Sequence, residues 1–125
     1  MSNRDAILRY LDGYNKQDAE AVVATFAKDG TYTDPLTPLI PAIQVSAMCA
    51  QLFVALPDVT FEVTDLLDGG QGRFALHYFM RGTTPSGRQV TMGGADFILV
   101  EDGKLRSVVG YFDSGTYLRQ IGVAV

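Results

Sequence analysis

The sequence predicts an α+β fold in which three helices precede a curved, mostly antiparallel sheet. Apolar residues recur at helical spacing as far as residue 56, and after Pro57 they alternate with polar residues as they do in strands. Glycine-containing turn signals then separate four long alternating stretches. Because the helices come before the strands, we expect them on one face of the sheet. The length of 125 residues predicts a single domain, residues 1–125.

The composition argues against several classes of function. The net charge is −4 and Lys and Arg do not cluster, which is atypical of a nucleic-acid or acidic-membrane surface. The apolar runs are short for a membrane span, and the first residues lack the order of a signal peptide, so we expect a soluble, cytoplasmic protein. One cysteine and one histidine leave no metal-site spacing. We therefore expect no metal and no cofactor.

The first helix is expected over residues 3–15. Ser2 and Asp5 form a plausible capping box at its start. Ile7, Tyr10 and Tyr14 recur at helical spacing, so Tyr10 is expected on the buried stripe and not on the charged face.

A second helix follows Asp18, which is a good N-cap, and is expected to carry Phe26 on its apolar face. Gly30 ends this helix, and a short strand over residues 31–34 ends at Asp34. The Asp-Pro pair requires an extended backbone at Asp34, which excludes a helical position.

Three prolines predict an irregular segment after Asp34. A third helix is then expected over residues 41–56, apolar on nearly every side, so that it is either buried or covers a cavity. The following strands are expected at residues 59–67, 73–83, 88–100 and 104–112, and a last helical turn or tail at residues 114–121.

The strand at residues 73–83 carries large apolar side chains on both faces. One face can pack on the helices, whereas the other needs a cover. We expect a homodimer that packs sheet against sheet.

Two aspartates are candidates for chemistry. Asp34 lies at a strand end beside apolar residues, where it either caps a turn or presents a carboxylate to a pocket. Asp96 lies in the middle of an apolar strand, so it is either hydrogen-bonded or has a raised pKa. Its structural alternative is a bond to a backbone group or to an arginine such as Arg81 or Arg106. Both alternatives remain open at the level of sequence.

The order of elements resembles the nuclear transport factor 2-like fold, and the chain resembles its ketosteroid isomerases and SnoaL-like proteins. The segment RYLDGYNKQDAEAVVATFAKDGTYTDP is similar to the N-terminal half of the isomerases. This resemblance implies that Tyr10 is an oxyanion donor and Asp34 the catalytic base. The segment GADFILVEDGKLRSVVGYFD implies that Asp96 is the second oxyanion donor and Phe112 a large aromatic residue of the pocket.

The resemblance implies a cofactor-free isomerase that moves a double bond in an apolar ketone through a dienolate. The substrate would be steroid- or polyketide-like. An alternative is a SnoaL-like polyketide cyclase, hydratase or lyase, and another is a non-catalytic, dimeric ligand-binding scaffold. The expected pocket walls are Phe26, Phe53, Met80, Met92, Phe97 and Phe112.

Two further residues are secondary candidates. Asp113 lies in GYFDSGTYLRQIG, which resembles the C-terminal signature of SnoaL-like proteins, where late aspartates serve acid–base chemistry. Its simpler role is an N-cap for the residues from Ser114 on. His77, between Arg73 and Arg81 on its strand face, is most simply a surface or dimer-face residue, and more distantly an anion contact.

Overall fold

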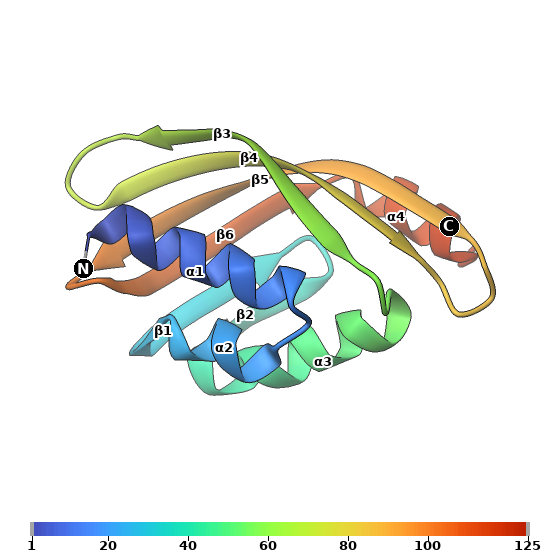
Figure 1. Ribbon diagram of the computed structural model, residues 1–125, viewed down its shortest axis with the longest axis horizontal. Coiled ribbons are helices and arrows are strands. Elements are labelled where there is room, and N and C mark those ends of the chain that lie inside the picture. Colours follow the sequence, from blue (N-terminus) through green and yellow to red (C-terminus); the bar gives the residue numbers. More distant parts are fainter. Residues whose placement is uncertain (1, 125) are drawn as a thin grey trace.

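A computed structural model describes residues 2–124 and confirms the α+β class (Figure 1). Three helices lie on one side of a curved six-stranded sheet, and a fourth lies at its C-terminal end (Figure 1). In chain order the elements are α1 (Asn3–Asn15), α2 (Ala19–Ala24), β1 (Phe26–Asp34), β2 (Thr37–Pro41), the short 3-10 turn η1 (Ala42–Gln44), α3 (Val45–Ala55), β3 (Thr60–Asp68), β4 (Arg73–Thr83), β5 (Gln89–Glu101), β6 (Lys104–Phe112) and α4 (Ser114–Ile121).

The sheet has the strand order β2-β1-β6-β5-β4-β3. All neighbours are antiparallel except β1 and β6, which are parallel. Helix α1 packs against β3, β5 and β6. The long central strands therefore present one face to the helices, and this face carries the core.

The start of α1 forms as predicted. The Asp5 backbone N–H donates to the Ser2 hydroxyl at 3.1 Å, and the Ser2 N–H donates to the Asp5 carboxylate at 3.3 Å. These two bonds satisfy donors that the first helical turn leaves free. The third hairpin turn also forms as predicted, because Asp102 and Gly103 both adopt positive φ (52° and 73°).

The second helix is shorter than predicted, and Phe26 lies in a strand instead. Helix α2 ends at Ala24 because the next residue joins the sheet. The Thr25 carbonyl accepts a hydrogen bond from the Leu105 N–H at 2.8 Å, and Phe26 pairs with Leu105 in the parallel ladder. Pairing with β6, a contact distant in sequence, therefore overrides the local helical pattern.

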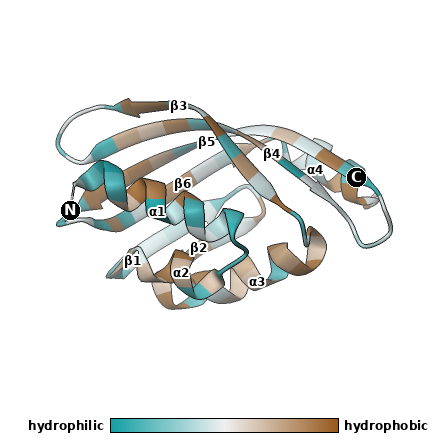
Figure 2. Cartoon of the chain, viewed as in Figure 1, coloured by the Kyte–Doolittle hydropathy of each residue, from teal (hydrophilic) through white to brown (hydrophobic). Residues whose placement is uncertain are grey.

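The segment predicted to be irregular forms strand β2. Two of its residues, Pro38 and Pro41, are tolerated because β2 is the edge strand of the sheet and part of its backbone needs no partner. The following helix starts later than predicted, at Val45. Although α3 is hydrophobic over most of its length (Figure 2), only Val45 and Cys49 are buried on it, and Val54 is 74% exposed. Helix α3 thus covers a cavity on one side and leaves apolar side chains in solvent on the other.

Candidate active site

A cavity of about 320 Å³ lies between the helices and the inner face of the sheet. Apolar and aromatic side chains from α1, α3, β3, β4, β5 and β6 form most of its wall. Its ionisable groups are two carboxyls and five phenols: Asp34, Asp96, Tyr10, Tyr14, Tyr32, Tyr78 and Tyr117. Within residues 2–124 no lysine, arginine or histidine lines this cavity. Its fixed charge is therefore negative.

Asp34 lies at the end of β1, as predicted, and both of its carboxylate oxygens accept hydrogen bonds. The Tyr32 hydroxyl donates to Oδ2 at 2.6 Å, and the Leu36 backbone N–H donates to Oδ1 at 2.8 Å. Tyr32 reaches it because residues two apart in a strand point to the same side. Two donors of this kind fix the orientation of the carboxylate.

Asp96 lies mid-strand on β5, opposite Gly110 on β6, and only 8% of it is exposed. Among residues 2–124 no hydrogen bond to the Asp96 carboxyl contributes to its surroundings, although Asp96 lines the cavity. Burial, followed by the charge of Asp34, raises the pKa of Asp96 from 3.8 to about 7. Asp96 is thus neutral over much of the acidic range and has a free carboxyl to offer to a ligand.

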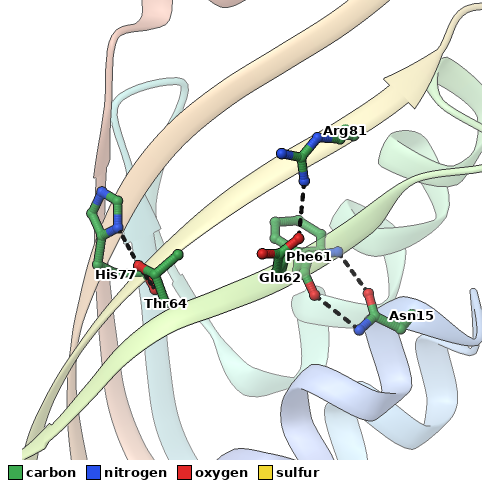
Figure 3. A network of polar contacts seen from close by, with 6 residues as sticks. All are labelled: Asn15, Phe61, Glu62, Thr64, His77 and Arg81. Atoms are coloured by element: carbon green, nitrogen blue, oxygen red, sulfur yellow. Dashed lines mark hydrogen bonds and ion pairs between the residues drawn. The ribbon is translucent and has the colours of Figure 1, made fainter.

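The arginine alternative for Asp96 is wrong. Arg81 lies on the outer face of the sheet and pairs with Glu62 at 3.2 Å (Figure 3). Arg106 pairs with Asp29 and approaches Glu101 at 3.7 Å. Neither guanidinium compensates the buried carboxyl.

Tyr10 projects from α1 toward these carboxyls and is 2% exposed. Burial, then the charge of Asp96, raises the pKa of Tyr10 well above 10, and contact with the Tyr14 hydroxyl acts in the opposite direction. The Tyr10 hydroxyl is therefore a donor throughout the physiological range. Its ring packs edge-to-face against Tyr14 and Phe26, with centroids 5.1 and 5.8 Å away.

Two glycines provide space for this arrangement. A Cβ at Gly110 would lie 2.9 Å from Asp96 Oδ1 and 3.4 Å from the Cβ of Asp34, so the two aspartates converge over this residue. A Cβ at Gly94 would lie 2.4 Å from the Tyr78 hydroxyl. The absent side chains thus allow two acids and a phenol to approach the β5–β6 backbone.

Three of the six residues predicted to form the pocket wall line the cavity, namely Met80, Met92 and Phe112. Phe97 does not, and is 56% exposed, because Asp96 faces inward and its neighbour in the strand must face outward. Phe53 packs against the Tyr14 ring with centroids 6.3 Å apart, outside the cavity wall. Phe26 lies behind Tyr10 and supports its ring.

Sequence reasoning missed four tyrosines of the cavity: Tyr14, Tyr32, Tyr78 and Tyr117. The pattern contained a signal for three of them. Tyr14 lies one helical turn after Tyr10, and Tyr78 shares a strand face with Met80. Tyr32 lies two residues before Asp34 in the predicted strand. Tyr117 depends on where α4 packs, which no local pattern shows.

The secondary candidates lie outside the cavity wall. Asp113 caps α4, where its carboxylate accepts from the Thr116 N–H at 3.0 Å and the Thr116 hydroxyl at 2.8 Å. The Thr116 backbone bond is the largest cause of the lowered pKa of Asp113. His77 contacts the Thr64 hydroxyl at 2.6 Å on the outer face of the sheet (Figure 3).

No helix among residues 2–124 has both the length and the apolar character to cross a bilayer. In the same part of the chain, no three His, Cys, Asp or Glu side chains gather in a way that could hold a metal ion.

The SnoaL-like domain family matches residues 7–108 of the sequence, which is most of the chain. Compared by sequence with curated proteins, the chain matches none. Comparison with solved structures, in contrast, finds many of the same fold.

Three of these structures illustrate the fold. A hypothetical protein with a ketosteroid isomerase-like fold from Catenulispora acidiphila, in complex with trimethylamine, is 18% identical with a TM-score of 0.85, over 95% of this chain and 93% of its own. A candidate SnoaL-like polyketide cyclase from Jannaschia sp. CCS1 is 16% identical with a TM-score of 0.84, over 98% and 93%. A nuclear transport factor 2-like protein from Burkholderia pseudomallei is 20% identical with a TM-score of 0.87, over 98% and 100%.

At these identities the solved structures establish the fold alone. They confirm the resemblance to the nuclear transport factor 2-like fold, with its curved open sheet and few helices. The sequence match, which covers the segment from α1 into β6, establishes the family. The chain belongs to the SnoaL-like domain family.

Proposed function

We propose that this chain is a cofactor-free acid–base enzyme that moves a double bond in an apolar ketone. One observation carries the proposal: Asp34 and Asp96 converge over Gly110 in a cavity that Tyr10 also lines. Two carboxyls in different surroundings, with a protonated phenol beside them, provide a base and a pair of hydrogen-bond donors.

In this proposal the Asp34 carboxylate removes a proton from the carbon between the carbonyl and the isolated double bond. The electron pair of that C–H bond moves onto the carbonyl oxygen and forms a dienolate. Tyr10 and neutral Asp96 donate hydrogen bonds to this oxygen. Asp34 then returns the proton two carbons along, which regenerates the carboxylate and leaves the double bond conjugated with the carbonyl.

The cavity suits an apolar, steroid- or polyketide-like ketone. Its volume of about 320 Å³ is near the lower end of the ~300–1,000 Å³ that small-molecule sites occupy. Methionine and phenylalanine side chains on β4, β5 and β6 would contact the hydrocarbon part of the substrate. The two carboxyls and Tyr10 would fix the carbonyl end.

The test is the absorbance of the conjugated enone formed from a β,γ-unsaturated 3-ketosteroid. We expect Asp34→Asn to lower turnover by about 10²–10⁴-fold, the range for loss of a general base. Tyr10→Phe should lower it by about 10²-fold through loss of one oxyanion donor. Tyr111→Phe is the control, since Tyr111 is 57% exposed on the outer face of the sheet. Full activity of Asp34→Asn would contradict the mechanism.

A SnoaL-like polyketide cyclase, hydratase or lyase is the second candidate, and the family match favours it. A cyclase would use the same residues. Asp34 removes a proton to form an enolate, the enolate carbon bonds to a second carbonyl carbon of the same molecule, and the alkoxide formed there takes the proton back from Asp34. Binding of the steroid without turnover would support this candidate. Neither binding nor turnover would favour the third alternative, a non-catalytic ligand-binding scaffold.

We also propose that the chain forms a homodimer through the outer face of the sheet. Phe79, Phe97 and Tyr111 are exposed on neighbouring strands β4, β5 and β6, and Phe97 and Tyr111 pack edge-to-face with centroids 6.0 Å apart. Sedimentation equilibrium should show a dimer that Phe97→Glu dissociates. The matched control is Val54→Glu on α3, which should leave the dimer intact.

A further inference from the structure

We propose that the cavity also binds apolar ammonium ions, with the Asp96 carboxylate as their counter-ion. This inference rests on the proposed function only in placing the ligand site in the same cavity. It assigns the site a second class of ligand, a hydrocarbon amine that competes with the neutral ketone.

The first observation is the missing partner of Asp96. Its side chain is more than nine-tenths buried and lines the cavity, yet within residues 2–124 its carboxyl has no hydrogen-bond donor and no cation. A buried carboxylate left in this state is costly. A ligand that brings a positive N–H group supplies both the charge and the donor that the protein omits.

The second observation is the difference between the two aspartates. Asp34 already accepts from the Tyr32 hydroxyl and the Leu36 N–H, so each of its oxygens has one donor. Asp96 is the free acceptor. The distinction assigns the counter-ion to one residue, although both carboxyls add to the negative potential of the cavity.

The third observation is the character of the groups that face Asp96. Tyr10 on α1, Tyr32 and Asp34 on β1 and Tyr78 on β4 all lie close enough to interact with its charge. None of the four can carry a positive charge. Aromatic rings around an anionic group form the kind of surface that attracts ammonium ions. The same groups disfavour a ligand carboxylate or phosphate.

The two ligand classes should depend on pH in opposite directions. A ketone accepts a hydrogen bond from neutral Asp96, whereas an ammonium ion needs the ionised form. Because the pKa of Asp96 is about 7, ammonium affinity should rise about tenfold between pH 6 and pH 8, while ketone affinity falls over the same range. An alkylammonium ion has a pKa of about 10 and stays charged throughout.

The experiment uses three probes of one shape: the bridgehead amine, alcohol and carboxylate of adamantane. Calorimetric titration at pH 8 should give the tightest binding for the amine, weaker binding for the alcohol and none for the carboxylate. Asp96→Asn should lower amine affinity at least tenfold and abolish its rise with pH. Alcohol binding should persist in that variant, which shows that its cavity is intact.

Equal binding of amine and alcohol, or no binding of the amine, would overturn the proposal. Full amine affinity in Asp96→Asn would also overturn it. The same holds if Asp34→Asn abolishes amine binding and Asp96→Asn does not. If Asp96→Asn does not fold, the opposite pH trends of amine and ketone on the natural sequence decide the question. Amine binding needs no turnover, so it can hold where the proposed reaction fails, and the reaction can hold where amine binding fails.

Discussion

The end of β1 and the middle of β5 each bring one aspartate to the same cavity, but they surround its carboxyl with different groups. At the strand end, Asp34 accepts hydrogen bonds from two donors, the Tyr32 hydroxyl on the strand and the Leu36 N–H in the following turn. In mid-strand, Asp96 has only apolar neighbours, phenols and the negative charge of Asp34. The difference shows how one side-chain type can provide both a base and an acid, because the surroundings decide which form is stable.

The largest expected effect concerns stability and separates the two regions. The pKa of Asp96 is 3.8 in the unfolded chain and about 7 in the folded chain, so between these values the folded state holds a proton that the unfolded state has lost. The free energy of unfolding therefore falls as pH rises through this window. Asp96→Asn should remove this pH-dependent loss. Compared with the natural sequence, the variant should gain up to ~4 kcal/mol in free energy of unfolding between pH 4 and pH 8.

Urea unfolding at pH 4 and pH 8 measures this gain. Asp113→Asn is the matched control, because hydrogen bonds lower the pKa of Asp113 and its carboxylate stabilises the fold above pH 4. The control should therefore be less stable than the natural sequence by a similar amount at pH 4 and at pH 8, because the contribution of the Asp113 carboxylate is already largely present at pH 4. A gain of the same size in both variants would remove the contrast between buried and capping aspartates.

A smaller effect is expected where the two aspartates meet. Gly110→Ala places a methyl group 2.9 Å from Asp96 Oδ1 and should cost about 2 kcal/mol of stability, as overpacking does, and displace the carboxyl from the cavity. Gly93→Ala on the outer face is the control, because its nearest neighbour, an atom of the Phe79 ring, lies at 3.4 Å. Thermal unfolding of both variants gives the comparison. Similar losses of stability in the two variants would show that a methyl group fits at Gly110 as well as it does on the outer face.

The smallest effect is expected at the strand end. Tyr32→Phe removes the hydroxyl that donates to Asp34 Oδ2 and should lower ketone turnover about tenfold, equivalent to ~1.4 kcal/mol, with KM little changed. Tyr117→Phe changes a phenol that lines the same cavity without bonding to Asp34, and should have a smaller effect on kcat. Steady-state kinetics distinguishes the two. Equal losses would mean that Tyr32 contributes shape and not orientation.

The sequence carries most of the helix and strand pattern because these elements follow local rules. The capping box, the alternation in β4 and β5 and the glycine turns all depend on residues a few positions apart. The errors lie at β1 and β2, where the decisive contacts are distant in sequence. Pairing of Phe26 with Leu105 and the edge position of β2 follow from the tertiary fold.

The candidate site was predictable to a similar extent. The positions of Asp34, Tyr10 and Asp96 on the cavity wall were expected from the resemblance and from strand periodicity, whereas their roles stay predictions. Phe97 was misplaced although it follows the inward-facing Asp96, and strand alternation alone could have excluded it. The bond from Tyr32 to Asp34 and the fit at Gly110 needed coordinates, since both depend on side-chain placement across the strand end.

The most direct test is a pH titration of the aspartate carboxyl carbons by NMR, with carbon-13 label in aspartate and Asp96→Asn for assignment. We expect one resonance with a midpoint near pH 7 that is absent from the variant. Such a result would establish a buried acid that is neutral in the acidic range and free to donate to a ligand. If every aspartate titrates below about pH 5, as exposed carboxyls do, the assigned role of Asp96 as a neutral hydrogen-bond donor is contradicted.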